Sequence, residues 1–84
     1  MKKNVLITGA AGGIGKSICM SLLKKYNLIL VGRNKKNLDS FISDHQSVIK
    51  RITCDLRDKT EIKKMYEHIV NDGLQVDILI NNAG

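Results

Sequence analysis

The apolar residues of this chain fall into short continuous runs, separated by longer stretches in which they recur every three or four positions. The segments that contain these runs are residues 5–8, 28–31, 48–54 and 77–81, and the third of them also carries Lys50 and Arg51. Runs of this length are typical of strands in a parallel sheet, because such strands are covered on both faces. The pattern therefore predicts four strands.

Each stretch between two predicted strands has helical periodicity. The first helix is expected over residues 14–25, and its apolar stripe consists of Ile14, Ile18, Leu22 and Leu23. The second helix is expected to begin near Asn34, and its apolar positions are Leu38, Phe41 and Ile42.

The third predicted helix has a start and an end signal. Asp58, followed three residues later by Glu61, indicates a capping box at its start, and Asp72-Gly73 indicates its end. Its apolar stripe consists of Ile62, Met65, Tyr66, Ile69 and Val70.

Strands and helices thus alternate in the order βαβαβαβ, which favours a parallel sheet with helices on its faces. We predict an α/β fold of the Rossmann type, a doubly wound parallel sheet with the strand order 3-2-1-4. Right-handed crossovers would place the first two helices on one face of the sheet and the third on the other.

The first strand runs into a glycine-rich loop, TGAAGGIGKS, over residues 8–17. Its end, Gly-Lys-Ser, resembles a P-loop, but a P-loop needs four residues between its two glycines. The first glycine would then stand at position 10, where this chain has Ala10. The spacing therefore argues against an NTPase.

The same loop fits a dinucleotide site better. The common fingerprint G-x-G-x-x-G fails, because Ile18 stands where its third glycine would be, but T-G-x-x-x-G-x-G fits Thr8, Gly9, Gly13 and Gly15. Glycines here let the chain turn sharply and let a pyrophosphate approach the backbone, and the following helix supplies N–H donors and a positive dipole end.

Three motifs in the expected order resemble those of the short-chain dehydrogenase/reductases. They are the glycine loop, Asp55-Leu56 after the third strand, and Asn81-Asn82-Ala83-Gly84 after the fourth. The resemblance covers the whole chain. The loop also satisfies T-G-x-x-G-x-x-G, the pattern of the extended, epimerase-like branch, but the NNAG end favours the core reductase branch.

This resemblance implies a set of cofactor contacts. The backbone from Gly9 to Ile14 would hold the pyrophosphate and the adenosine ribose, Asp55 would accept from the adenine amino group, and the Leu56 N–H would reach the ring. The segment 82–84 would line the ribose and nicotinamide side. The expected binding residues are Gly9, Ala11, Gly12, Gly13, Ile14, Gly15, Arg33, Asn34, Asp55, Leu56, Asn82, Ala83 and Gly84.

The end of the second strand predicts the choice of cofactor. An NAD enzyme of this type has an acidic residue there that accepts from the ribose hydroxyls. This chain has Gly32 there, followed by Arg33, whose guanidinium can form a forked contact with a phosphate. We therefore expect NADP(H) to be preferred, with NAD also possible.

The family's catalytic residues are missing from this chain. They are a Tyr-x-x-x-Lys pair and an upstream Ser, whereas Tyr26 is followed four residues on by Leu30, and Tyr66 by Val70. We expect residues 1–84 to form the N-terminal, cofactor-binding part of a longer reductase, a truncated sheet without activity of its own. The complete protein would act on a small carbonyl or alcohol substrate, and could be a homo-oligomer. The alternative is a stand-alone dinucleotide-binding module without catalysis.

Composition narrows the remaining function classes. The net charge of +6 is spread along the chain, and three aromatic residues offer no stacking platform, so a nucleic-acid binder is disfavoured. The apolar runs are too short for a membrane span, and no signal peptide is expected, which together suggest a cytoplasmic protein. Cys19 and Cys54 are expected to be buried free thiols, and neither they nor the two histidines have metal-ligand spacing.

Overall fold

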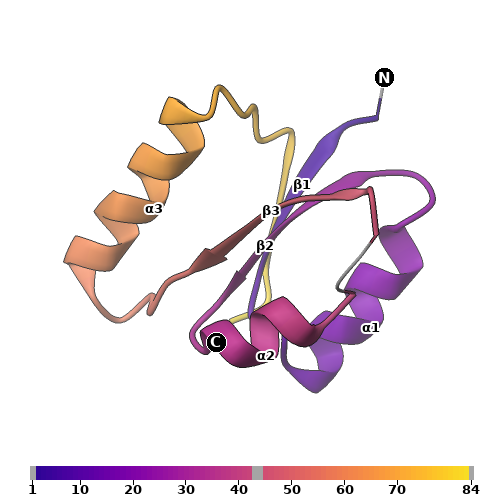
Figure 1. Cartoon of the computed structure of the whole chain (residues 1–84), viewed down its shortest axis with the longest axis horizontal. Helices are drawn as coiled ribbons and strands as arrows, with labels where there is room; N and C mark the ends of the chain where they lie inside the picture. The colour runs from indigo at the N-terminus through magenta and orange to yellow at the C-terminus, as the bar shows by residue number, and fades with distance from the viewer. Residues whose placement is uncertain (1, 43–44, 84) are drawn as a thin grey trace.

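The structure is a computed structural model that describes residues 2–42 and 45–83. Within these residues the strands are β1 (Asn4–Thr8), β2 (Asn27–Gly32), β3 (Val48–Thr53) and β4 (Ile78–Asn81). The helices are α1 (Gly13–Leu22), α2 (Lys35–Ser40) and α3 (Lys59–Asn71). Figure 1 shows the sheet between α3 on one side and α1 and α2 on the other. The predicted alternation of strands and helices is confirmed.

The sheet is parallel throughout and has the order β3-β2-β1-β4, as predicted. At the carboxyl end of β1, Thr8 lies opposite Val31 of β2 and Asn81 of β4. Because these strands end level with one another, the loops that follow them leave from one edge of the sheet. This is the edge at which open α/β sheets bind their ligands.

The core has two layers, one on each face of the sheet. Alternate residues of β1 and β2, such as Ile7 and Leu30, pack with the helices α1 and α2. The residues between them, such as Leu6 and Ile29, pack with side chains of α3 and its flanking loops. Side chains that alternate between two covered faces explain why these strands read as continuous apolar runs.

Two of the predicted apolar stripes are only partly buried. Ile14 is 72% exposed, because α1 begins at Gly13 and its first turn lies at the loop end, where it lines the cleft described below. On α3, Met65 and Ile69 pack on the sheet, whereas Tyr66 is 66% exposed. These apolar positions therefore do not all belong to the core.

The second helix is shorter than its apolar pattern predicts. It ends at Ser40, and Phe41 and Ile42 follow it in a turn while still packing against the core. Arg51 of β3 fixes this turn by donating from Nη1 to the carbonyl oxygens of Leu38, at 2.6 Å, and Phe41, at 2.5 Å. These bonds satisfy carbonyl groups at a helix end that would otherwise lack partners.

The predicted cap of α3 is present, with one difference in its hydrogen bonds. Asp58 Oδ1 accepts from the N–H groups of Thr60, at 2.8 Å, and Glu61, at 3.4 Å. Glu61 Oε1 accepts from the N–H of Asp55, at 3.0 Å, and not from that of Asp58 as a capping box would require. The start of α3 is thereby tied to the end of β3.

The two cysteines are free and buried, as predicted. Among the described residues, no helix has the length and apolar character needed to cross a membrane.

Candidate functional site: a cleft at the carboxyl edge of the sheet

A cleft of about 710 Å³ lies where the loops that follow β1, β2, β3 and β4 meet. It brings together residues that are far apart in the sequence, from Gly9 in the first loop to Ala83 in the last. Most of the predicted binding residues line it: Gly9, Ala11, Gly12, Gly13, Ile14, Arg33, Asn34, Asp55, Leu56, Asn82 and Ala83. Gly15 lies beneath the loop, and Gly84 is outside the described residues.

Two glycines fix the shape of the glycine loop. Gly9 has a φ of +64°, a conformation that L side chains rarely adopt, and it turns the chain away from β1. At Gly15, an added Cβ would stand 2.0 Å from the carbonyl oxygen of Gly9, so only glycine allows α1 to pack this closely on the loop. Gly13, by contrast, has open space around it. The fold therefore requires a glycine at position 15, whereas the glycine at position 13 lines the cleft without being required by the packing.

The amino end of α1 is directed to the same loop. Gly12 is the N-cap residue, with extended backbone and no side-chain cap, and its carbonyl oxygen accepts from the Lys16 N–H at 2.8 Å. The first N–H groups of a helix have no partner within the helix, and together with the helix dipole they attract anions. A pyrophosphate is the kind of group that such a helix end, flanked by glycines, can hold.

Lys16 argues against a P-loop in the folded chain as well. Its ammonium nitrogen lies 5.5 Å from the centroid of the Phe41 ring, a cation–π distance. Lys16 is not among the residues that line the cleft. A P-loop lysine must reach the phosphates, so this position supports the dinucleotide interpretation of the loop.

The segment after β4 is tied to the glycine loop by hydrogen bonds. The buried hydroxyl of Thr8 accepts from the N–H groups of Asn82, at 3.0 Å, and Ala83, at 3.1 Å, and it donates to Asn81 Oδ1 at 3.0 Å. Asn82 Nδ2 donates to the carbonyl oxygen of Gly9 at 3.2 Å. These bonds join two walls of the cleft, so the two asparagines have a structural role whether or not a ligand is bound.

The loop after β2 contributes Arg33 and Asn34. Arg33 is exposed at the cleft, and in the described part of the chain no carboxylate lies within ion-pair distance of it. Asn34 Oδ1 accepts from the Asn37 N–H at 3.0 Å and caps α2. Asn34 therefore lines the cleft, but its side-chain oxygen already has a structural partner.

The loop after β3 holds a bidentate ion pair. Arg57 donates to both carboxylate oxygens of Asp55, from Nε to Oδ1 at 3.0 Å and from Nη2 to Oδ2 at 2.9 Å. These hydrogen bonds lower the pKa of Asp55 to about 2, with a smaller contribution from the charge of Arg33. Asp55 thus stays ionised, and Arg57 covers part of the carboxylate that we expect to meet the adenine.

The sequence did not identify every residue of this cleft. Arg57, Asn37, Cys54 and Val31 also line it, as does Gly32, whose place before Arg33 was used above to predict the choice of cofactor. Cys54 is buried there, and burial, followed by the nearby charges of Glu61, Asp55 and Asp58, raises the pKa of its thiol. The signal in the sequence that could have indicated Arg57 is its position, two residues after Asp55 and just beyond a strand.

Comparison with known proteins agrees with this geometry. The model of the short-chain dehydrogenase family matches residues 3–84. The chain belongs to this family. A very-long-chain 3-oxoacyl-CoA reductase of Pyrenophora tritici-repentis is 43% identical over 91 aligned positions, which cover 94% of this chain and 25% of that protein. An NADP-dependent 3-hydroxy acid dehydrogenase of Schizosaccharomyces pombe is 33% identical, covering 98% of this chain and 34% of that protein.

A solved short-chain dehydrogenase structure has the same fold. The structure of 4-hydroxyisoleucine dehydrogenase complexed with NADH superposes with a TM-score of 0.87 at 30% identity, covering 99% of this chain and 34% of that one. The chain thus spans about a quarter to a third of the length of these relatives.

Proposed function

We propose that this chain binds NADP(H) as the N-terminal, cofactor-binding part of a short-chain reductase, residues 1–84 of a longer domain. The observation that carries the proposal is the position of the glycine loop and Arg33 in one cleft, with Gly32 at the end of β2 in place of a carboxylate. A carboxylate at that position would repel the 2′-phosphate of NADP, whereas a guanidinium attracts it.

The relatives support a nicotinamide dinucleotide without fixing which one. One is named as NADP-dependent, and one structure holds NADH. The preference for NADP(H) therefore rests on this chain's own residues. The glycine loop and the amino end of α1 would hold the pyrophosphate. Arg33 would bind the 2′-phosphate, and the loop after β3 would bind the adenine.

The cofactor, once bound, would supply hydride transfer to a carbonyl or from an alcohol. Among the described residues, neither tyrosine is placed to donate a proton in that step. The Tyr26 side chain packs in the core against α1, Tyr66 lies on the exposed side of α3, and neither lines the cleft. The chain's own contribution is to bind and orient the dinucleotide, and the acid for catalysis would come from residues outside this segment.

The proposal is tested by measuring the dissociation constants of NADPH and NADH by calorimetry. We expect NADPH to bind about ten- to a hundredfold more tightly, because a hydrogen bond to a charged group contributes about 1.5–3 kcal/mol. Arg33→Ala should remove most of that preference, whereas Lys36→Ala, which removes an exposed charge from α2 nearby, should leave it nearly unchanged. A wild-type chain that favours NADH, or an unchanged ratio in Arg33→Ala, would show that the role given to Arg33 is wrong.

A further inference from the structure

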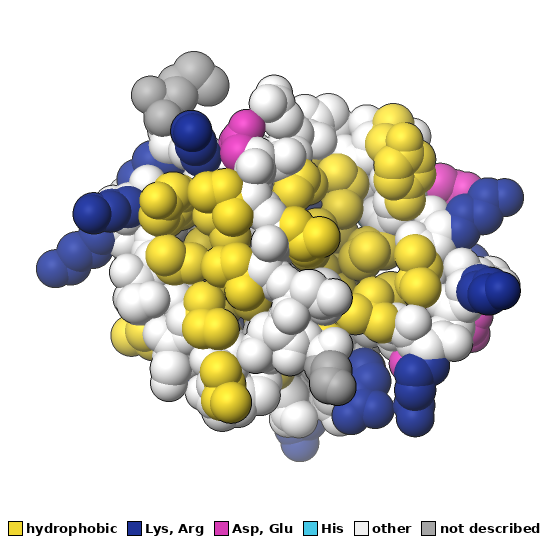
Figure 2. All heavy atoms as spheres, turned by 180° about the vertical axis from the view of Figure 1, so that it is seen from behind, with side chains coloured by type: hydrophobic (Ala, Val, Ile, Leu, Met, Phe, Trp, Pro, Cys, Tyr) yellow, Lys and Arg dark blue, Asp and Glu magenta, His cyan; other side chains and the backbone are white. Residues whose placement is uncertain are grey.

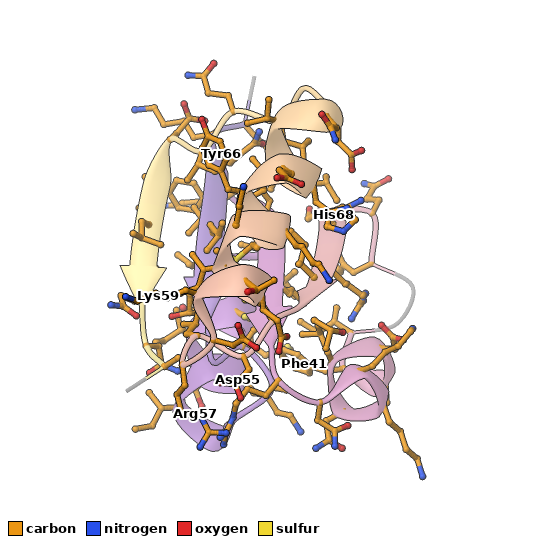
Figure 3. The ribbon with its side chains drawn as sticks, turned by 90° about the vertical axis from the view of Figure 1, so that its left-hand side faces the viewer. Phe41, Asp55, Arg57, Lys59, Tyr66 and His68 are labelled. Atoms are coloured by element: carbon orange, nitrogen blue, oxygen red, sulfur yellow. The ribbon has the colours of Figure 1, made fainter. Side chains whose placement is uncertain are left out.

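Arg57 has more hydrogen-bonding capacity than Asp55 uses. Its Nε, Nη2 and backbone N–H donate to the Asp55 carboxylate, at 3.0, 2.9 and 3.0 Å. Among the described residues, Nη1 has no acceptor, and the side chain is 77% exposed. Figure 3 shows the pair beyond the carboxyl ends of the strands, at the end of the molecule where the cleft lies. One edge of the guanidinium is therefore held in place while another remains available.

A second hollow adjoins the main cleft at this point. It is lined by Arg33, Asn34, Asn37, Asp55, Arg57 and Glu61, and all of these except Glu61 also line the main cleft. The hollow thus lies at the adenosine end of the proposed cofactor site, between the loop after β2 and the loop after β3. Four of its six lining side chains carry a guanidinium or an amide group.

The two carboxylates of the hollow are already engaged. Asp55 is held by Arg57, and Glu61 Oε1 accepts from the Asp55 N–H at 3.0 Å, in the first turn of α3. Two positive and two negative side chains make the local sum of charges zero, and removing Arg57 alone would make it −1. Without Arg57, a phosphate that approached Arg33 would also meet the uncompensated carboxylate of Asp55.

We propose that Arg57 supplies a second cationic contact to a phosphate monoester on the adenosine ribose, donating from Nη1 while Nε and Nη2 remain on Asp55. Arg33 and Arg57 then approach the phosphate from the loops after β2 and β3. Arginine suits this double role, because its planar group has five donors in a fixed arrangement. The inference rests on the proposed function, and it adds a selectivity residue that lies outside the motifs of the sequence.

The test uses the full chain and two nucleotides that differ only in this phosphate. The dissociation constants of adenosine 2′,5′-bisphosphate and adenosine 5′-monophosphate are measured by calorimetry at low salt, and their ratio gives the preference for the 2′-phosphate. We expect Arg57→Gln to lower this ratio about five- to tenfold. Lys24→Gln removes the same charge from an exposed position just beyond α1 and should leave the ratio nearly unchanged.

Two further variants test whether a positive charge alone is enough at position 57 and whether Arg57 acts only through Asp55. Arg57→Lys keeps the charge but cannot bind Asp55 in two places and also reach the phosphate, so the ratio should fall at least about twofold. This variant decides the question if circular dichroism shows that Arg57→Gln is unfolded. In an Asp55→Asn background, the amide oxygen can still accept a hydrogen bond from Arg57, so the effect of Arg57→Gln should persist if Arg57 contacts the phosphate directly and should vanish if Arg57 acts only by neutralising Asp55.

Each other outcome overturns a defined part of the argument. An unchanged ratio in Arg57→Gln or Arg57→Lys overturns the role of Arg57 and leaves the proposed function standing. Loss of the Arg57 effect in the Asp55→Asn background overturns the direct contact. A wild-type chain that binds both nucleotides equally overturns the 2′-phosphate site but not dinucleotide binding, and a chain that binds neither overturns both proposals.

Discussion

The thiol of Cys19 is fully buried between α1 and the sheet, and this burial raises its pKa from an ordinary 9.0 to about 11. Below its pKa in the unfolded chain, the thiol is protonated in both the folded and the unfolded state. Its ionisation therefore does not change the free energy of unfolding up to about pH 9. Between pH 9 and 11 the unfolded chain loses this proton more readily than the folded chain does. Stability should therefore fall over that range, by up to about 3 kcal/mol.

Urea denaturation at several pH values between 8 and 11 checks this prediction, with Cys19→Ala as the comparison. The variant loses packing and starts from a lower stability, but its decline with pH should be shallower than that of the wild type. All other ionisable groups are the same in both proteins, so the difference in slope isolates Cys19. Parallel slopes would mean that the folded chain does not hold this thiol protonated.

The site residues that the sequence revealed share a simple property: they lie in the segments that follow the predicted strands. Arg33 and Asp55 could be placed on that ground, because the ends of parallel strands meet at one edge. The hydrogen bonds made by Thr8 could not be predicted from the sequence, since they depend on the register that sets Thr8 opposite Asn81. The pairing of Arg57 with Asp55 depends on the turn after β3, which the apolar pattern does not describe.

At the scale of elements, the junction of β1 and α1 allows two glycines to be tested separately. Gly15→Ala would place a Cβ against the backbone of Gly9, and we expect a loss of stability of at least about 3 kcal/mol. Gly13→Ala has open space at the first residue of α1, and alanine favours a helix, so stability should rise by about 0.5 kcal/mol. The added methyl group should nevertheless weaken NADPH binding, because it lies where the pyrophosphate would approach the backbone.

Urea denaturation and calorimetric titration with NADPH provide the two measurements for this pair. If Gly13→Ala binds NADPH as tightly as the wild type does, the pyrophosphate does not approach the backbone at this position. A stable Gly15→Ala would show that the loop can move away from α1.

The elements themselves followed largely from periodicity, and the exceptions have physical causes. Strand order and helix faces were predicted correctly, because continuous apolar runs and right-handed crossovers leave few arrangements. The end of α2 was not predicted correctly, because Arg51, ten residues beyond Phe41, binds the carbonyl groups of that turn. A long-range side-chain contact of this kind leaves no periodic signal in the sequence.

At the scale of the whole molecule, the two outer strands of the sheet differ in character. β3 carries Lys50 and Arg51, and charged residues on an outer strand discourage pairing with other chains. β4 carries Ile78, Leu79 and Ile80, and no strand pairs with its outer edge within the described residues. Figure 2 views this edge and shows apolar side chains gathered on both sides of a central strip of backbone.

We predict that the chain self-associates through β4, and that Leu79→Lys reduces this association. Leu79 is 64% exposed, and on α3, which covers the same face of the sheet, Tyr66 and Val70 are 66% and 53% exposed. A lysine on an open strand edge opposes edge-to-edge pairing and breaks up the apolar patch.

Sedimentation velocity over a range of concentrations should show larger species for the wild type and fewer for Leu79→Lys. Ile49→Lys makes the same change on the already charged β3 and should behave like the wild type. Equal association in all three proteins would mean that contacts between chains form on another surface.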